Sequence, residues 1–243
     1  SYTPDGSFYN LDKDKAEQLL DESGFKRVDV SQDMIDNPEH SPELSAIIAY
    51  ASSTQIAATG YWRVALKDKE YQVLALKLSV PENGRMDVAE SLKKDWELIG
   101  VKTIIVPVAL ASLNAEIIAG HNFEALLYGQ VVGTEPDVAP FWHSSQIGGQ
   151  GLNLSGYNNA EVDTLLIEAR QTADNINLRF SKYKKFQEII SKDLPVIFLY
   201  SPRYTYVQSK KVHGFNGTAI NEPCDRFAGF SHWYLKTKKH LSW

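Results

Sequence analysis

The carboxylates in this sequence that could act together in catalysis are Glu135 and Asp137, which flank Pro136. Two carboxyl groups that flank a sugar linkage can hydrolyse it, and their separation in space decides the stereochemical outcome. Closeness along the chain does not fix that separation. A loop that leads into a helix explains the same pair more simply, so a carboxylate-dependent hydrolase is kept as an alternative.

The histidines and the cysteine show none of the spacings that build a metal centre. The six histidines are dispersed, without an HxH, an HExxH or a pair four residues apart. The single cysteine, Cys224, excludes a disulfide within the chain and leaves no second thiol for zinc. The sequence therefore indicates neither a metal ion nor another cofactor, and it favours a protein that is not an enzyme.

Residues suited to reversible binding gather between positions 128 and 153. Flat apolar rings alternate there with neutral hydrogen-bonding groups, as in many ligand pockets. The predicted ligand-binding residues are Tyr128, Gln130, Val131, Val132, Thr134, Trp142, His143 and Asn153. Because the rings of Tyr128 and Trp142 flank the loop 129–135 and carry a polar edge, we expect both at the half-wet surface of a cleft.

The loop 129–135 follows a predicted strand. Residues 123–128 carry few charges and lie between the turn signal at Gly120 and the glycine Gly129, as a buried strand does. In an open α/β sheet, ligands bind where the chain leaves the carboxyl ends of the strands. This position makes the loop the first candidate for a site, although a core strand with an ordinary connection would give the same pattern.

Helix and strand patterns alternate along the rest of the chain. Capping residues and apolar spacing predict helices over residues 12–23, 41–52, 85–99, 112–119, 158–169 and 176–192. Strands are predicted over residues 61–67, 71–80, 101–108, 123–128 and 196–200, with a continuation at 204–207. The first two strands form a hairpin around Asp68 and Lys69, and the last helix buries Phe180 and Phe186. The order of elements predicts an α/β fold with a largely parallel sheet.

The composition of the chain limits the kinds of molecule that it could bind. The chain has 243 residues, of which 43% are hydrophobic and 23% charged, and a net charge of −5 without a basic stripe. Such a chain forms an ordinary globular core and is a poor partner for nucleic acid. No apolar run approaches the roughly 18–20 residues that span a bilayer. The chain opens almost directly into a helix, and we expect upstream residues, with any export signal, to be absent from it.

Five segments in a fixed order resemble one protein family. They are DKDKAEQLLDESGF, ESLKKDWELIGVKTIIV, FEALLYG followed by EPD, FWHSS with LNLSGYNNAEVDTLLIEAR, and KDLPVIFLYSPRYTYV before VHGF. Together they resemble the extracytoplasmic solute-binding proteins of the oligopeptide, dipeptide and nickel ABC importers (family 5). The resemblance runs over nearly the whole chain from about Asn10.

The resemblance implies a two-lobed binding protein of the periplasmic type, about twice as long as this chain. Residues 1–213 would be the carboxy-terminal ligand-binding lobe, a mixed sheet flanked by helices, and residues 214–243 a tail that returns towards an amino-terminal lobe. Such a protein is expected to capture a peptide or another small polar solute and deliver it to a membrane permease. It would be a monomer outside the cytoplasm, periplasmic or held as a lipoprotein. A sensor subunit that presents bound solute to a receptor is an alternative.

The resemblance also implies a departure from the peptide-binding members. In those proteins an aspartate four residues before the loop proline pairs with the ammonium group of the ligand, and here that position is Val132. The aromatic residue expected after Gly129 is Gln130. We therefore expect free peptides to bind badly, and a sugar, a capped peptide or another uncharged polar solute to bind better.

Overall fold

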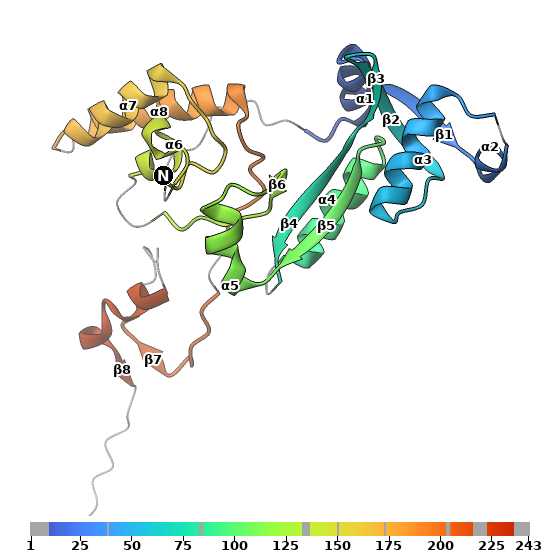
Figure 1. The fold of residues 1–243 in the computed structure, drawn as a ribbon. Helices are drawn as coiled ribbons and strands as arrows, with labels where there is room; N and C mark the ends of the chain where they lie inside the picture. Colours follow the sequence, from blue (N-terminus) through green and yellow to red (C-terminus); the bar gives the residue numbers. More distant parts are fainter. Residues whose placement is uncertain are drawn as a thin grey trace, which may run out of the picture. The chain divides into compact units, whose positions relative to one another are not determined.

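The computed structural model of the chain describes residues 10–37, 39–82, 85–132, 137–149, 151–172, 174–202, 205–215 and 223–235. The chain divides into two compact units. The sheet unit comprises residues 5–129 and 148–154, and the helical unit comprises residues 1–4, 130–147 and 155–243. Figure 1 shows the elements of both units in sequence colours. This division does not bear on the boundary predicted between residues 213 and 214, which stays a prediction.

A parallel sheet is the framework of the sheet unit. Among the described residues, its central strand β4 (Ala75–Pro81) pairs with β5 (Lys102–Val108) on one side and with β6 (Ala125–Leu126) on the other. The strands are parallel, as predicted, and the mixture of helices and sheets confirms the predicted α/β class.

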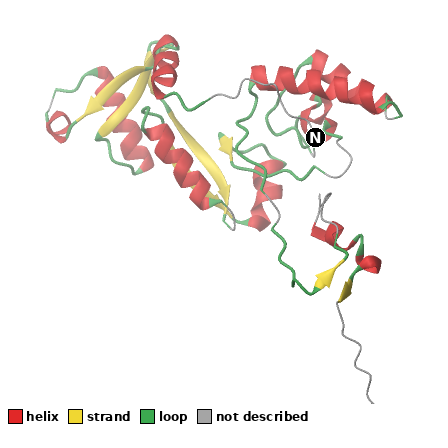
Figure 2. Cartoon of the chain, turned by 180° about the vertical axis from the view of Figure 1, so that it is seen from behind, coloured by secondary structure: helices red, strands yellow, loops and turns green. Residues whose placement is uncertain are grey.

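Helical segments make the crossovers between these strands. Helix α4 (Met86–Glu97) connects β4 to β5, and it lies alongside both strands in the two views of Figures 1 and 2. Its Ala89 is fully buried and packs in one cluster with Val80 of β4. The connection from β5 to β6 is α5 (Leu110–Ser112) and the π-helical segment Leu113–Ile118. Both helices predicted for this region are present, the second in this irregular form.

The strand predicted over residues 123–128 is present only as the short β6. The N–H of Leu127 donates to the carbonyl of Ser79 (2.9 Å), which extends the pairing past the end of β6. At the other end, the side chain of Glu124 accepts a hydrogen bond from the N–H of Lys77 (2.7 Å). A carboxylate thus satisfies a donor of β4 that a longer neighbouring strand would satisfy with its backbone.

The sheet unit also contains an antiparallel sheet with the strand order β1-β2-β3, whose strands precede the parallel sheet in the sequence. It comprises β1 (Lys26–Val30), β2 (Gly60–Lys67) and β3 (Glu70–Val73). Asp68 and Lys69 form the predicted hairpin turn with φ angles of 50° and 70°. Left-handed backbone at both positions matches the twist of the two strands, which is why two residues suffice.

The single strand predicted over residues 71–80 is wrong, because the chain changes sheets at Leu74. The N–H of Leu74 donates to the carbonyl of Arg63 in β2 (2.8 Å), whereas its carbonyl accepts from the N–H of Lys102, the first residue of β5 (3.1 Å). Apolar residues alternate through β3 and β4 alike. The alternation therefore carries no signal that the partner strand changes.

Three helices precede or connect the strands of this sheet: α1 (Lys13–Glu22) before β1, and α2 (Gln32–Asp36) and α3 (Pro42–Thr54) between β1 and β2. The first and third begin at the residues predicted as caps. The carboxylate of Asp12 and the hydroxyl oxygen of Ser41 each accept a hydrogen bond from the N–H three residues on, at 2.9 and 3.2 Å. Neither α2 nor β1 was predicted, since residues 28–38 are polar and lack a clear period.

Arg63 carries a charge into the interior of the sheet unit, where its side chain is 1% exposed. Its Nη1 lies 2.5 Å from the carboxylate of Asp21 and also donates to the carbonyl of Phe25 (3.1 Å), while its Nε donates to the carbonyl of Ile99 (3.2 Å). A Cβ atom on Gly100 would lie 2.8 Å from the Cγ of Arg63. This side chain thus ties α1 and the end of α4 to β2.

The helical unit is built on α6 (Ala139–Trp142), α7 (Ala160–Gln171) and α8 (Ile176–Asp193). Asn159, one of the two asparagines expected as the cap of this helix, caps α7 by accepting hydrogen bonds from two N–H groups of its first turn. The buried cluster between the helices is Ala139, Trp142, Val162, Leu165, Leu166, Phe186 and Ile190. No helix in the described ranges is long and apolar enough to cross a membrane.

Two expectations for this unit are wrong. Phe180 is 55% exposed rather than buried; it lies six residues before Phe186, which corresponds to about 240° around a helix. Residues 196–200 pair with no described segment as a strand, and Ile197 is 67% exposed. A strand needs a neighbour for its hydrogen bonds, and apolar β-branched sequence alone does not supply one. Of the predicted continuation, Tyr204 lies outside the described residues, and residues 205–207 form no strand.

The last described part of the chain folds on itself. Strand β7 (Val212–His213) pairs antiparallel with β8 (Tyr234–Leu235). The ring of Trp233 packs on three other rings at centroid distances of 5.5–5.9 Å: Phe215, Phe227 and Phe230. The role expected of residues 214–243, a tail that returns towards an amino-terminal lobe, stays a prediction.

Replacing Asp21 by Ala should lower the free energy of unfolding by about 2 kcal/mol. Stranding a buried charge costs roughly 3–5 kcal/mol, and the full cost is not reached because Asp21 is half exposed and Glu17 remains 3.9 Å from the guanidinium. Urea denaturation measures the loss. Glu22→Ala, on the same helical turn, is the control and should cost about 0.5 kcal/mol or less. Equal losses in the two variants would show that Asp21 does not hold Arg63.

Candidate functional site

The candidate site begins at the carboxyl edge of the parallel sheet. Pro81 at the end of β4 lies opposite Val108 at the end of β5, and the N–H of Glu82 still donates to the carbonyl of Val108 (3.0 Å). On the other side of β4, Leu127 is buried and Tyr128 is 39% exposed. The ring of Tyr128 therefore leaves the core at the edge where ligands bind in open α/β sheets.

Residues 130–132 continue the loop and belong to the helical unit. Gln130 is exposed, Val131 is 80% exposed and Val132 is 46% exposed. Exposed valines are accessible for a ligand. The predicted site residue Thr134 and the predicted carboxylate Glu135 lie outside the described residues.

Trp142 lies in the core of the helical unit and is 9% exposed. Its ring meets those of Tyr157, Phe186 and Phe198 at centroid distances of 6.4, 6.0 and 6.0 Å. The expectation that this ring lies at a half-wet surface is wrong, because the single turn of α6 directs it against α7 and α8. Contact between Trp142 and a ligand stays a prediction.

His143 and its neighbours form a hydrogen-bonded turn around Asp163. The hydroxyl of Ser144 donates to one carboxylate oxygen of Asp163 (2.5 Å) and its N–H to the other (2.8 Å). The Nδ1 of His143 accepts from the N–H of Ser145 (3.1 Å) and lies 3.7 Å from the carboxylate. Because the serine hydroxyl donates to the carboxylate, it is not aligned as a nucleophile on the imidazole.

Asn153 is fully buried in the sheet unit, with no exposed surface. A buried amide serves packing and internal hydrogen bonding first. Its predicted role in ligand binding stays a prediction.

Asp137, the described half of the carboxylate pair, is bound by Arg170. The guanidinium approaches both carboxylate oxygens at 2.7–3.1 Å, and the N–H of Ala139 donates to one of them (3.2 Å). The hydrogen bonds from Arg170 lower the pKa of Asp137, against a smaller opposing effect of burial. A carboxylate held ionised in this way is poorly suited to act as a general acid.

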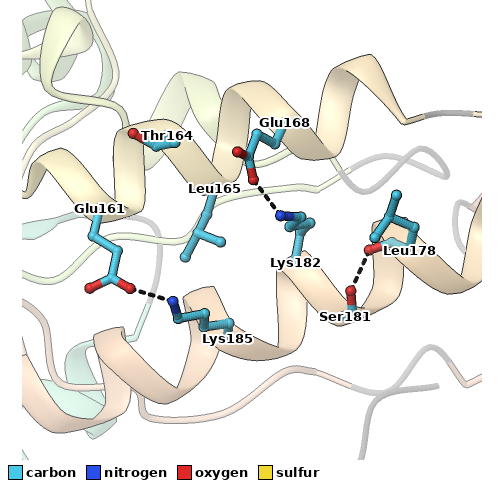
Figure 3. A pocket seen from close by; sticks show the side chains of 8 residues that line it. All are labelled: Glu161, Thr164, Leu165, Glu168, Leu178, Ser181, Lys182 and Lys185. Carbon is cyan, nitrogen blue, oxygen red and sulfur yellow. Dashed lines mark hydrogen bonds and ion pairs between the residues drawn. The ribbon is translucent and has the colours of Figure 1, made fainter.

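A groove of about 560 Å³ runs between α7 and α8 and contains none of the predicted site residues. Figure 3 shows its walls, with Glu161 facing Lys185 (2.5 Å) and Glu168 paired with Lys182. Each lysine on the groove already has a carboxylate partner across it. These two ion pairs hold α7 and α8 together. They leave neither lysine of the groove available for a charged ligand.

Arg85 is the residue at the candidate edge that sequence reasoning missed. It follows β4 and precedes α4, and its guanidinium lies against Gly129, directly after Tyr128. The available signal was its place just after a predicted strand end. No group of three or more His, Cys, Asp or Glu side chains in the described part of the chain could hold a metal ion.

The fold described here is shared with solved substrate-binding proteins of ABC transporters, and this chain covers about 30–40% of the length of each. No protein-family model matches it. Its relatives in sequence and structure include the oligopeptide- and dipeptide-binding proteins of ABC importers, which confirms the resemblance predicted from the five segments.

Three relatives define the extent of the match. The oligopeptide-binding protein AppA of Bacillus subtilis is 29% identical over 151 residues, 61% of this chain and 27% of AppA. Its structure with a nonapeptide covers 98% of this chain and 40% of AppA, with a TM-score of 0.64 and 22% identity. Heme-binding protein A of Haemophilus influenzae is 29% identical over 70% of this chain and 28% of its own length. The mannohexaose-bound oligopeptide-binding protein of Thermotoga maritima has a TM-score of 0.53 and 22% identity over 77% of this chain and 30% of its own.

Trp142→Ala should lower the free energy of unfolding by about 3–5 kcal/mol, the usual cost of removing a buried aromatic side chain. Tyr128→Ala is the matched comparison and should cost about 1 kcal/mol or less, because the ring of Tyr128 is partly exposed. Chemical denaturation followed by circular dichroism measures both. If Trp142→Ala left stability intact and weakened solute binding, the ring would belong to the ligand site.

Asp137→Asn should remove a pH-dependent contribution of about 0.5–1 kcal/mol, a modest value because both partners are partly exposed. Since folding lowers the pKa of Asp137, the contribution is fully present above the ordinary aspartate pKa of about 3.9. It is lost as the pH falls through the lower value of the folded state. Denaturation between pH 7 and pH 2 should show the variant approaching the parent at the acid end, and Asp174→Asn is the control. A constant difference at every pH would contradict this ion pair.

Proposed function

We propose that this chain is part of the solute-binding component of an ABC importer, which captures a peptide or another small polar solute between two lobes and delivers it to a membrane permease. The observation that carries the proposal is its sequence identity to AppA, together with the shared fold over almost all of this chain. The protein is proposed to act as a monomer outside the cytoplasm, either periplasmic or held as a lipoprotein.

The candidate edge supports binding rather than catalysis. Tyr128 presents a flat, partly exposed ring just after β6, on the side of β4 away from β5, which suits reversible stacking on a solute. The carboxylate of Asp137, which a hydrolase would need, is occupied by Arg170. Closure of two lobes around the solute would set the affinity through contacts made only in the closed state.

The solute class follows from the position of Val132. A peptide's ammonium group would be buried there without a carboxylate, at a cost on the order of 3–5 kcal/mol. That cost is roughly a hundred- to several-thousand-fold in affinity. The relatives carry either kind of solute, since AppA is solved with a nonapeptide and the Thermotoga maritima protein with mannohexaose. We propose a solute without a free amino group at this position.

Calorimetry on the intact protein tests the function and the solute class together. One peptide is offered in free-amine and acetylated forms, beside a panel of neutral oligosaccharides. We expect the acetylated peptide or an oligosaccharide to bind at least tenfold more tightly than the free amine. Val132→Asp should reverse the preference between the two peptides because it supplies the missing carboxylate.

Val131→Asp is the matched control, because it adds the same charge at the neighbouring exposed position. It should leave the preference unchanged if Val132 alone faces the ligand. Tighter binding of the free amine by the parent protein would contradict the proposed solute class. Turnover of any panel member would contradict the proposed role in binding.

A further inference from the structure

Another groove, of about 390 Å³, lies at the edge of the parallel sheet where β5 begins. Its lining comes from α4, from the residue just after that helix and from the first residue of β5: Glu90, Lys93, Lys94, Glu97, Leu98 and Lys102. The seven residues of β5 place this edge roughly 20 Å from the carboxyl edge of the sheet. The groove is therefore not part of the candidate site.

Three of the lining residues are lysines, and none of the three makes a hydrogen bond or an ion pair with any residue in the described ranges. Glu90 and Glu97 stand three or four residues from Lys93 and Lys94, which is the spacing at which ion pairs usually form on a helix. In the groove between α7 and α8, by contrast, both lysines are paired with carboxylates. The lysines beside β5 thus keep their donors for a ligand.

Lys102 holds its ammonium group in a partly buried position. Its Nζ lies 4.6 Å from the ring centroid of Trp62, a side chain with no exposed surface. Burial lowers the pKa of this ammonium group; the negative charge of Glu97 opposes the effect, and the positive charge of Lys93 adds to it. A bound anion would offset both the burial of Lys102 and its repulsion by Lys93.

We propose that this groove binds the phosphate group of a phosphate ester, held mainly by Lys93 and Lys102. Ammonium groups that approach from several sides suit a tetrahedral anion, whereas a planar carboxylate is matched better by the fork of an arginine. The groove is large enough for a phosphate together with a small organic group. The ester is either a small soluble molecule or a phospholipid headgroup, since both present the same phosphate chemistry.

Two binding measurements on the intact protein test the site and distinguish the two sources. Calorimetry compares glycerol 3-phosphate with acetate at equal ionic strength. Sedimentation compares phosphatidylcholine vesicles with and without phosphatidylglycerol. The parent protein should bind glycerol 3-phosphate at least tenfold more tightly than acetate, or bind vesicles only when they contain phosphatidylglycerol. The measurement that responds identifies the source of the phosphate.

Four variants connect that binding to the groove. Lys102→Gln and Lys93→Gln should each weaken it fivefold or more. Glu97→Gln should strengthen it, because this change removes a negative charge from the lining. Lys69→Gln is the matched control, since Lys69 is an exposed cation of the same unit that does not line the groove, and it should leave binding unchanged.

A measurement on the parent protein avoids any effect of these substitutions on folding. A water-soluble N-hydroxysuccinimide ester acetylates lysine amines, and mass spectrometry follows the rate at each lysine. The phosphate probe that binds should slow acetylation of Lys102 at least fivefold and leave the rate at Lys69 unchanged.

Several outcomes would overturn the inference. Equal binding of glycerol 3-phosphate and acetate, together with no dependence on phosphatidylglycerol, would show that the groove does not select phosphate. Binding that survives both Lys93→Gln and Lys102→Gln, or unchanged acetylation of Lys102, would place the phosphate elsewhere. An equal loss in Lys69→Gln would show a general charge effect. None of these results concerns solute capture at the carboxyl edge, so the proposed function would stand.

Discussion

The parallel pairing of β4 with its two neighbours is the constraint on which the rest of the sheet unit depends. Parallel strands cannot be joined by a tight turn, so the chain must cross over through α4 and through the helical segments before β6. Because all three strands run in one direction, their carboxyl ends meet at one edge. Arg85 therefore lies against Gly129, although the two residues are far apart in the sequence.

The elements that local chemistry determines could be predicted from the sequence. Asp12, Ser41 and Asn159 cap helices because a short side chain meets an N–H group two or three residues away, and no distant residue takes part. Strand pairing depends on distant residues. The change of sheet at Leu74 and the missing partner of residues 196–200 could not be predicted, since apolar alternation says which residues favour a strand but not which strand they join.

The same division applies to the candidate site. The place of Tyr128 at a strand end follows from its own segment and was predicted. The burial of Trp142 depends on Phe186 and Phe198, which lie on later parts of the chain, so a half-exposed ring was a reasonable but wrong expectation. Arg85 was missed because its significance comes from contact with Gly129, and a surface arginine ahead of a helix is ordinary in a sequence.

Charge at such an edge acts mainly when a binding protein closes. An exposed charged group remains hydrated in the open state of such a protein and costs little there. In the proposed function, closure would remove water, and a charged group of the solute without a partner would then lie in a low-dielectric environment. Under that function, a solute with an ammonium group would find no carboxylate at Val132. Discrimination would then come from the poor closure of the wrong complexes as much as from contacts with the right one.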